Sequence, residues 1–232
     1  MPYFWMYDPR YWLFVLPALL LGLYAQYKVR SSFGKYLKVP NQRGISGVRA
    51  AEILLSSAGL SHVDVEGTQG ALSDHYDPRS RVLRLSRPVA YSASVGAISV
   101  VAHEVGHAVQ DATNYGPMKL RTGIVPVVSL GSWLGPILFI LGLATANEQL
   151  ALIGVIGFAA TAVFSLVTLP VELNASSRAL ALLQSTGLIS SSEVPAARQV
   201  LNAAALTYVA ALVQAISTLL YYVMLLGGMR RE

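Results

Sequence analysis

The sequence predicts a mainly α-helical, polytopic membrane protein with four transmembrane helices and a small α+β part outside the membrane. Hydrophobic residues make up 54% of the 232 residues, and charged residues make up only 12%, about half of the roughly 25% found in soluble chains. Four stretches of 17 to 23 residues carry no charge, and such lengths approach or exceed what a hydrocarbon core of about 30 Å requires. This composition excludes a wholly soluble enzyme and a disordered chain.

The charge-free stretches define the four predicted transmembrane helices. They run from Tyr11 to Tyr27, from Ile124 to Ala146, from Gln149 to Pro170 and from Ala205 to Leu226. The alternative, buried helices of a large soluble core, is disfavoured because charge-free runs of this length are rare in soluble helices. The first stretch lacks a small-residue cleavage site, so we interpret it as a retained anchor instead of a signal peptide.

These helices divide the chain into five consecutive segments. We expect an N-terminal anchor, a soluble part, a transmembrane hairpin, a second soluble helical part, and a C-terminal transmembrane helix with its tail. The boundaries are residues 1–27, 28–123, 124–170, 171–204 and 205–232. The polar residues 147–149 predict the tight turn of the hairpin.

The distribution of basic residues predicts the orientation. With four crossings both soluble segments lie on one side, which carries 14 of the 17 Lys and Arg residues. The positive-inside rule makes that side cytoplasmic. The net charge of +5 is thus a topology signal, and no nucleic-acid-binding motif accompanies it. The absence of cysteine excludes disulfides, a thiolate metal site and a cysteine nucleophile.

The first soluble segment alternates helical and strand patterns. A helix is predicted from Ser46 to a stop at Gly59. Residues 71–76 and 81–86 predict a β-hairpin around the turn at 77–80, with a further strand at 63–65. The small, apolar and proline-free stretch from Ala90 to about Asp111 predicts one helix.

That last helix contains the sequence His103-Glu104-Val105-Gly106-His107. Four residues are slightly more than one helical turn, so both imidazoles project from one face and can bind one metal ion. Glu104 is close enough to accept a proton from a water molecule on that ion. This arrangement is typical of zinc metalloproteases, so the sequence predicts a Zn²⁺ site and a zincin-like soluble part.

A catalytic zinc ion needs a third protein ligand. The extended metzincin pattern is absent, because Gln110 and Thr113 stand where glycine and histidine are required. His62 and His75 are upstream alternatives, but Glu172 is the better candidate because the transmembrane hairpin returns the chain to the side that it left. We expect Glu172 to open a new helix at the membrane edge; the alternative is a plain acidic residue near a helix N-terminus.

The chain resembles the gluzincin-type membrane proteases, which include the HtpX heat-shock proteases and the CAAX prenyl proteases. It is most similar to the bacterial YugP-like family of neutral zinc metallopeptidases. Three runs carry this resemblance: residues 74–79 with Leu85-Ser86, residues 101–110, and residues 169–172 with Ala175-Ser176 and residues 178–180. The resemblance implies that His103, His107 and Glu172 bind zinc and that Glu104 is the catalytic base.

One position departs from the HtpX-type pattern. There an aspartate four residues after the ligand glutamate supports a ligand histidine, whereas this chain has Ser176, with Asn174 nearby. Either uncharged side chain could accept an imidazole hydrogen bond. Candidates for a donor to the transition-state oxyanion are His75, Tyr76 and Arg178, although His75 and Arg178 could equally be surface residues.

The function expected from these residues is a multi-pass endopeptidase of the bacterial plasma membrane with its active site on the cytoplasmic side. Its expected partners are membrane-associated protein or peptide substrates and the lipid bilayer, not nucleic acid. The alternative is a non-enzymatic zinc-binding adaptor or assembly factor, which would not need Glu104. A transporter is disfavoured because the four predicted spans contain no charged residue. The sequence leaves the oligomeric state open.

Overall fold

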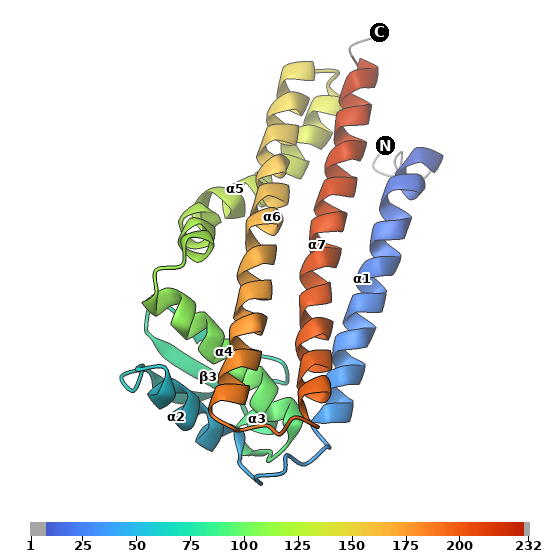
Figure 1. The fold of residues 1–232 in the computed structure, drawn as a ribbon. Coiled ribbons are helices and arrows are strands. Elements are labelled where there is room, and N and C mark those ends of the chain that lie inside the picture. The colour runs from blue at the N-terminus through green and yellow to red at the C-terminus, as the bar shows by residue number, and fades with distance from the viewer. Residues whose placement is uncertain (1–7, 230–232) are drawn as a thin grey trace. The chain divides into compact units, whose positions relative to one another are not determined.

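The structure is a computed structural model and describes residues 8–229 (Figure 1). The helices are α1 (Pro9–Tyr36), α2 (Gly47–Ser57), α3 (Arg87–Tyr91), α4 (Val95–Ala112), α5 (Gly116–Ala144), α6 (Glu148–Ser185) and α7 (Val194–Met229). The strands are β1 (Asp64–Thr68), β2 (His75–Asp77) and β3 (Val82–Ser86). The predicted mainly α-helical class is confirmed. Residues 1–7 and 230–232 of the predicted anchor and tail lie outside the described residues.

The chain forms two compact units. Among the described residues, the first comprises 8–25, 119–170 and 207–229, and the second comprises 26–118 and 171–206. The four longest helices, α1, α5, α6 and α7, each contribute one part to each unit. Each unit has its own buried core: Tyr221 and Phe139 belong to the first, and Leu54 and Ile98 belong to the second.

The first unit has the character of a membrane domain. Four helices, α1, α5, α6 and α7, are long and apolar enough to cross a membrane, as predicted. Large apolar side chains on them remain exposed, including Val127 at 68% and Trp133 at 67%. Apolar side chains exposed in such number suit a lipid surrounding and would be costly in water.

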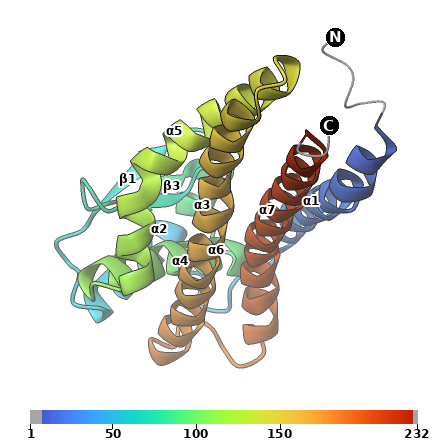
Figure 2. The same ribbon diagram turned by 90° about the horizontal axis from the view of Figure 1, so that it is seen from above.

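Glycines allow α5 and α6 to pack closely as a hairpin in the first unit (Figure 2). A Cβ atom added to Gly154 would lie 2.3 Å from the backbone nitrogen of Phe139, and one added to Gly142 would lie 2.3 Å from that of Ala151. Small residues allow such close backbone contact between membrane helices. The predicted turn is present, and Asn147 begins α6 by accepting the Leu150 N–H through Oδ1 at 3.0 Å.

The second unit packs a three-stranded sheet beside the almost completely buried helix α4. The strand order is β1-β3-β2, with β1 parallel and β2 antiparallel to β3, so β2 is an edge strand. The predicted hairpin is therefore confirmed, although its first strand is short. Ser46 caps α2 as expected, since its side chain accepts the Arg49 N–H at 3.4 Å.

Two predicted helix boundaries are wrong. The helix expected from Ala90 to Asp111 is split into α3 and α4, because Ser94 caps α4 by accepting the Ala97 N–H and because Asn41 N–H donates to Ala93 O. Glu172 does not open a helix, since α6 continues through it and tolerates Pro170 internally. Helix-dipole stabilisation of Glu172 therefore does not apply.

In the second unit, the backbones of helices α4 and α6 lie in close contact at Gly106. A Cβ atom at this position would lie 2.6 Å from the carbonyl oxygen of Ala175, which is too close for any side chain. Both backbones belong to regular helices and cannot yield locally, so a larger residue must push α6 away from α4.

We expect Gly106→Ala to destabilise the protein by about 1–3 kcal/mol, the typical cost of overpacking a core. The matched control is Gly34→Ala in α1, where an added Cβ meets nothing within 4 Å and alanine favours the helix. Thermal unfolding in detergent, followed by circular dichroism, measures both. Equal melting temperatures for the two variants would contradict the close approach.

Candidate metal centre

Helix α4 presents His103 and His107 on one face, as the four-residue spacing predicts. Their ring centroids lie 4.8 Å apart, with the ring planes at 85°. Both side chains are only slightly exposed, at 12% and 11%. The helix around them is buried, including Val101, Ala102 and Val105, each at 0%, so its position in the core fixes the direction of both rings.

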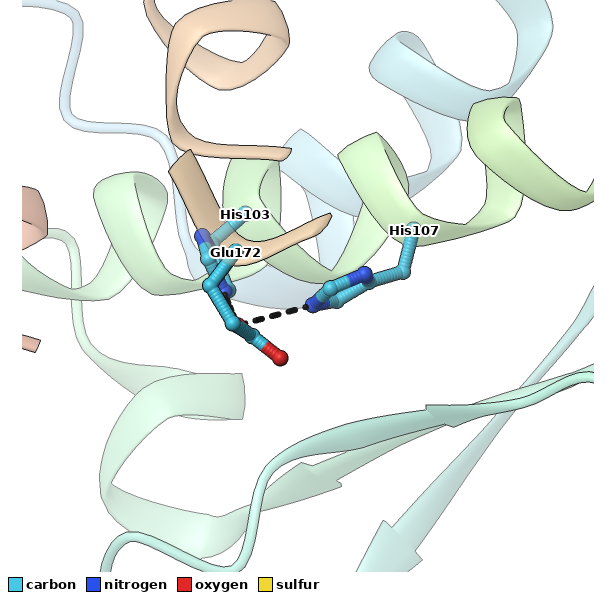
Figure 3. Close-up of side chains that lie close together, drawn as sticks. All are labelled: His103, His107 and Glu172. Carbon is cyan, nitrogen blue, oxygen red and sulfur yellow. Dashed lines mark hydrogen bonds and ion pairs between the residues drawn. The ribbon is translucent and has the colours of Figure 1, made fainter. Parts of the chain in front are cut away.

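Glu172 reaches the same point from α6 (Figure 3). Its Oε2 atom lies 3.2 Å from His103 Nε2 and 3.4 Å from His107 Nε2. The ligand atoms of the three residues all lie within 4.8 Å of one another. Glu172 is buried, so its carboxylate charge is stabilised by these neighbours and not by water.

The donor set and its spacing fit a zinc ion. Zinc bonds to nitrogen and carboxylate oxygen are about 2.0–2.2 Å long, so ligands at two corners of a tetrahedron lie about 3.3–3.6 Å apart. The oxygen–nitrogen distances of 3.2 and 3.4 Å are close to this separation. Two histidines and one glutamate leave one of four positions open, as in catalytic zinc sites.

Each imidazole uses its other nitrogen for a supporting contact. His103 Nδ1 lies 3.2 Å from Ser176 Oγ, and His107 Nδ1 lies 3.0 Å from Gln110 Oε1. Ser176 was one of the two candidates for this support. Gln110 was missed, although it lies three residues after His107, on the same face of the helix.

Glu104 lies beside this group with its carboxylate held by the edge strand. Its Oε2 accepts the backbone N–H of Tyr76 at 3.1 Å. Burial raises the pKa of Glu104, although the charges of His103 and His107 oppose that rise. A buried carboxylate with a raised pKa is a stronger base than one exposed to water.

Strand β2 is fixed to its surroundings by three side chains. The Tyr76 hydroxyl donates to Asp111 Oδ2 on α4 at 2.9 Å. Asp74 accepts hydrogen bonds from Ser86, from the backbone N–H at 2.7 Å and from the hydroxyl at 3.0 Å, while burial raises the pKa of Asp74. The turn that follows β2 is also held by hydrogen bonds, and those from Ser80 lower the pKa of Asp77 to about 2.

Together these bonds fix the position of β2, so the strand holds the Tyr76 N–H in place for Glu104.

His75 and Arg178 are not brought into the group of ligand atoms. His75 is exposed, and its Nδ1 lies 2.8 Å from Ser73 O. In a strand, neighbouring side chains point to opposite faces, and Tyr76 is the residue whose hydroxyl reaches α4. Arg178 donates from Nε to Asn174 Oδ1 at 2.8 Å and lies 5.9 Å from the centre of the Tyr115 ring.

Comparison with known proteins supports zinc as the metal. The family described as "Putative neutral zinc metallopeptidase" matches residues 11–227. The chain belongs to this family. The "Putative membrane protease YugP" of Bacillus subtilis (strain 168) is 46% identical over 217 residues, which cover 94% of this chain and 96% of that protein. No solved structure matches the chain.

Membership of this family supports a zinc metallopeptidase with a zinc cofactor, and the four long apolar helices support a place in the membrane. The group of His103, His107 and Glu172 is positioned to hold that metal. The resemblance to the YugP-like family is confirmed.

We expect the purified protein to hold about one zinc ion per chain and Glu172→Ala to lose it, because two histidines alone leave half of a four-coordinate site empty. Elemental mass spectrometry of detergent-purified protein measures the metal content. His75→Ala is the control and should keep its zinc. Zinc retained by Glu172→Ala but lost by His75→Ala would move the third ligand to His75.

Proposed function

We propose that this protein is a membrane-embedded zinc endopeptidase whose zinc is bound by His103, His107 and Glu172 and whose general base is Glu104. The observation that carries the proposal is the convergence of three ligand atoms within 4.8 Å of one another, with a buried carboxylate on the neighbouring residue of the same helix. A structural zinc site closes its fourth position with protein and needs no base.

The reaction proposed is hydrolysis of a peptide bond. The zinc ion, when bound, supplies a Lewis acid that polarises the scissile carbonyl and lowers the pKa of a water molecule beside it. Glu104 accepts the proton of that water as it attacks the carbonyl carbon, and then delivers the proton to the leaving amine. The raised pKa of Glu104 suits the first role, since it makes the carboxylate a stronger base.

The Tyr76 N–H orients this base. Because it donates to Glu104 Oε2, one carboxylate oxygen is occupied and the other is left for the proton. In an antiparallel strand the N–H and C=O of one residue point to the same side, so the Tyr76 carbonyl also lies on the outer edge of β2. An extended substrate could pair with this edge.

We propose protein segments at or near the membrane as substrates, since the active-site helix belongs to a chain with four candidate membrane spans. His75 and Arg178 are left outside the proposed chemistry. His75 is bonded to its own loop, and Arg178 is engaged by Asn174 and Tyr115.

Glu104→Gln should lower the rate of peptide cleavage by about 10²–10⁴-fold while leaving the zinc content unchanged, because the amide cannot accept a proton. The measurement is cleavage of a fluorogenic peptide or an unfolded membrane protein, with zinc determined on the same sample. Glu52→Gln on the exposed face of α2, where Glu52 pairs with Arg49, is the matched control. A Glu104→Gln variant that cleaves as fast as the parent would refute the role of this base.

We also propose that the second unit lies on the cytoplasmic side, as the distribution of Lys and Arg supports. The chain contains no cysteine, so single cysteines report topology without background. A cysteine at Thr145, next to the hairpin turn, should react with an impermeant maleimide on intact cells. A cysteine at Ser61 should react only after the cells are permeabilised. The reverse labelling pattern would show that the second unit lies on the other side of the membrane.

A further inference from the structure

Both polar atoms of the Gln110 side chain form hydrogen bonds beside the candidate metal centre. Gln110 is 0% exposed. Its Oε1 lies 3.0 Å from His107 Nδ1, and its Nε2 donates to Val171 O at 2.8 Å and to Asn174 Oδ1 at 3.0 Å. One amide therefore contacts a predicted ligand on α4 and the backbone carbonyl directly preceding Glu172 on α6.

The chemistry of its partners leaves this amide only one orientation. The Val171 carbonyl can only accept a hydrogen bond, so the Gln110 NH₂ group must face it. Arg178 can only donate, and its Nε donates to Asn174 Oδ1 at 2.8 Å, so Asn174 also presents its oxygen to Gln110. Both N–H groups of Gln110 are thereby used, and only its oxygen remains for His107.

An amide oxygen cannot donate, so His107 must carry its proton on Nδ1. The lone pair of the neutral ring then lies on Nε2, the atom 3.4 Å from Glu172 Oε2. Ser176 imposes no such choice on His103, because a hydroxyl can donate or accept. The two histidines are therefore supported by different means.

We infer that Gln110 is a positioning residue that fixes His107 as an Nε2 metal ligand and ties that ligand to the helix of Glu172. The inference rests on the proposed zinc site and deepens it. The Gln110 amide is uncharged, and through this one side chain the two helices that carry the predicted ligands are linked. Hydrogen-bonded partners of metal ligands commonly change metal affinity when they are replaced.

The test compares Gln110→Met with the parent in zinc affinity and in the behaviour of the His107 ring. Methionine keeps the length of the side chain but removes all three hydrogen bonds. We expect the zinc Kd, measured by competition with a chelator, to rise by about 10–100-fold. In zinc-loaded protein labelled with ¹⁵N-histidine, the His107 Nδ1–H should exchange with water faster, while that of His103 is unchanged. The chain has only four histidines, so the spectrum can be assigned by substitution.

Gln110→Glu separates the two parts of the inference. A carboxylate still accepts from His107 Nδ1–H, so this proton should stay protected, but it cannot donate to Val171 or Asn174. Asn174→Leu, at a half-buried position, removes one acceptor without touching a ligand and should raise the zinc Kd several-fold even if Gln110→Met does not fold. Asn174→Asp keeps the acceptor and serves as its control.

The comparison variant for loss of a buried amide is Asn41→Leu. Asn41 is 3% exposed and bonds both its amide atoms to the Ile45 backbone, so its loss should change stability but neither zinc affinity nor His107. If Gln110→Met and Asn174→Leu bind zinc within about twofold of the parent and the His107 proton stays protected, the inference is wrong. A parent that holds no zinc would overturn the proposed function itself.

Discussion

The close approach of α4 and α6 is the contact on which the candidate metal centre depends. His103 and His107 are set by the core position of α4, but Glu172 joins them only because Gly106 has no side chain to hold Ala175 away. The distances of 3.2 and 3.4 Å from the Glu172 carboxylate to the two imidazoles follow from that spacing. The edge strand then adds the third element, since the Tyr76 N–H donates to the Glu104 carboxylate.

The three residues of the candidate metal centre could be predicted from sequence because both the helix spacing and the membrane topology point to them. The spacing of His103 and His107 is one helical turn, and Glu172 was favoured because the hairpin returns the chain to the same side. The spacing of three residues places Gln110 beside His107, but the orientation of its amide could not be predicted, because it depends on the Val171 carbonyl, 61 residues away in sequence. The sequence around a helical glutamine does not indicate which residues its side chain will bond. The role of Gln110 is visible only once α6 is packed beside it.

The fold class was predicted better than the ends of its helices. Charge-free stretches locate the apolar cores of α1, α6 and α7, but a helix can continue past the residue where charge begins. For this reason Glu172 was assigned to a new helix that does not exist, although Pro170 gave a reasonable stop signal. The break before α4 was missed because Ser94 and its neighbours bond to the distant residues 39–41.

The net charge of the metal centre depends on the fact that the side chains bonded to its two histidines are uncharged. Ser176 and Gln110 add no charge, so the two positive charges of a bound zinc ion are matched by the two carboxylates of Glu104 and Glu172. Without the ion these carboxylates would be buried with only the imidazoles to neutralise them, and they raise the pKa of His107 against the opposing effect of burial. Zinc binding therefore releases protons from the site, and the zinc affinity depends on the pH of the surrounding solution.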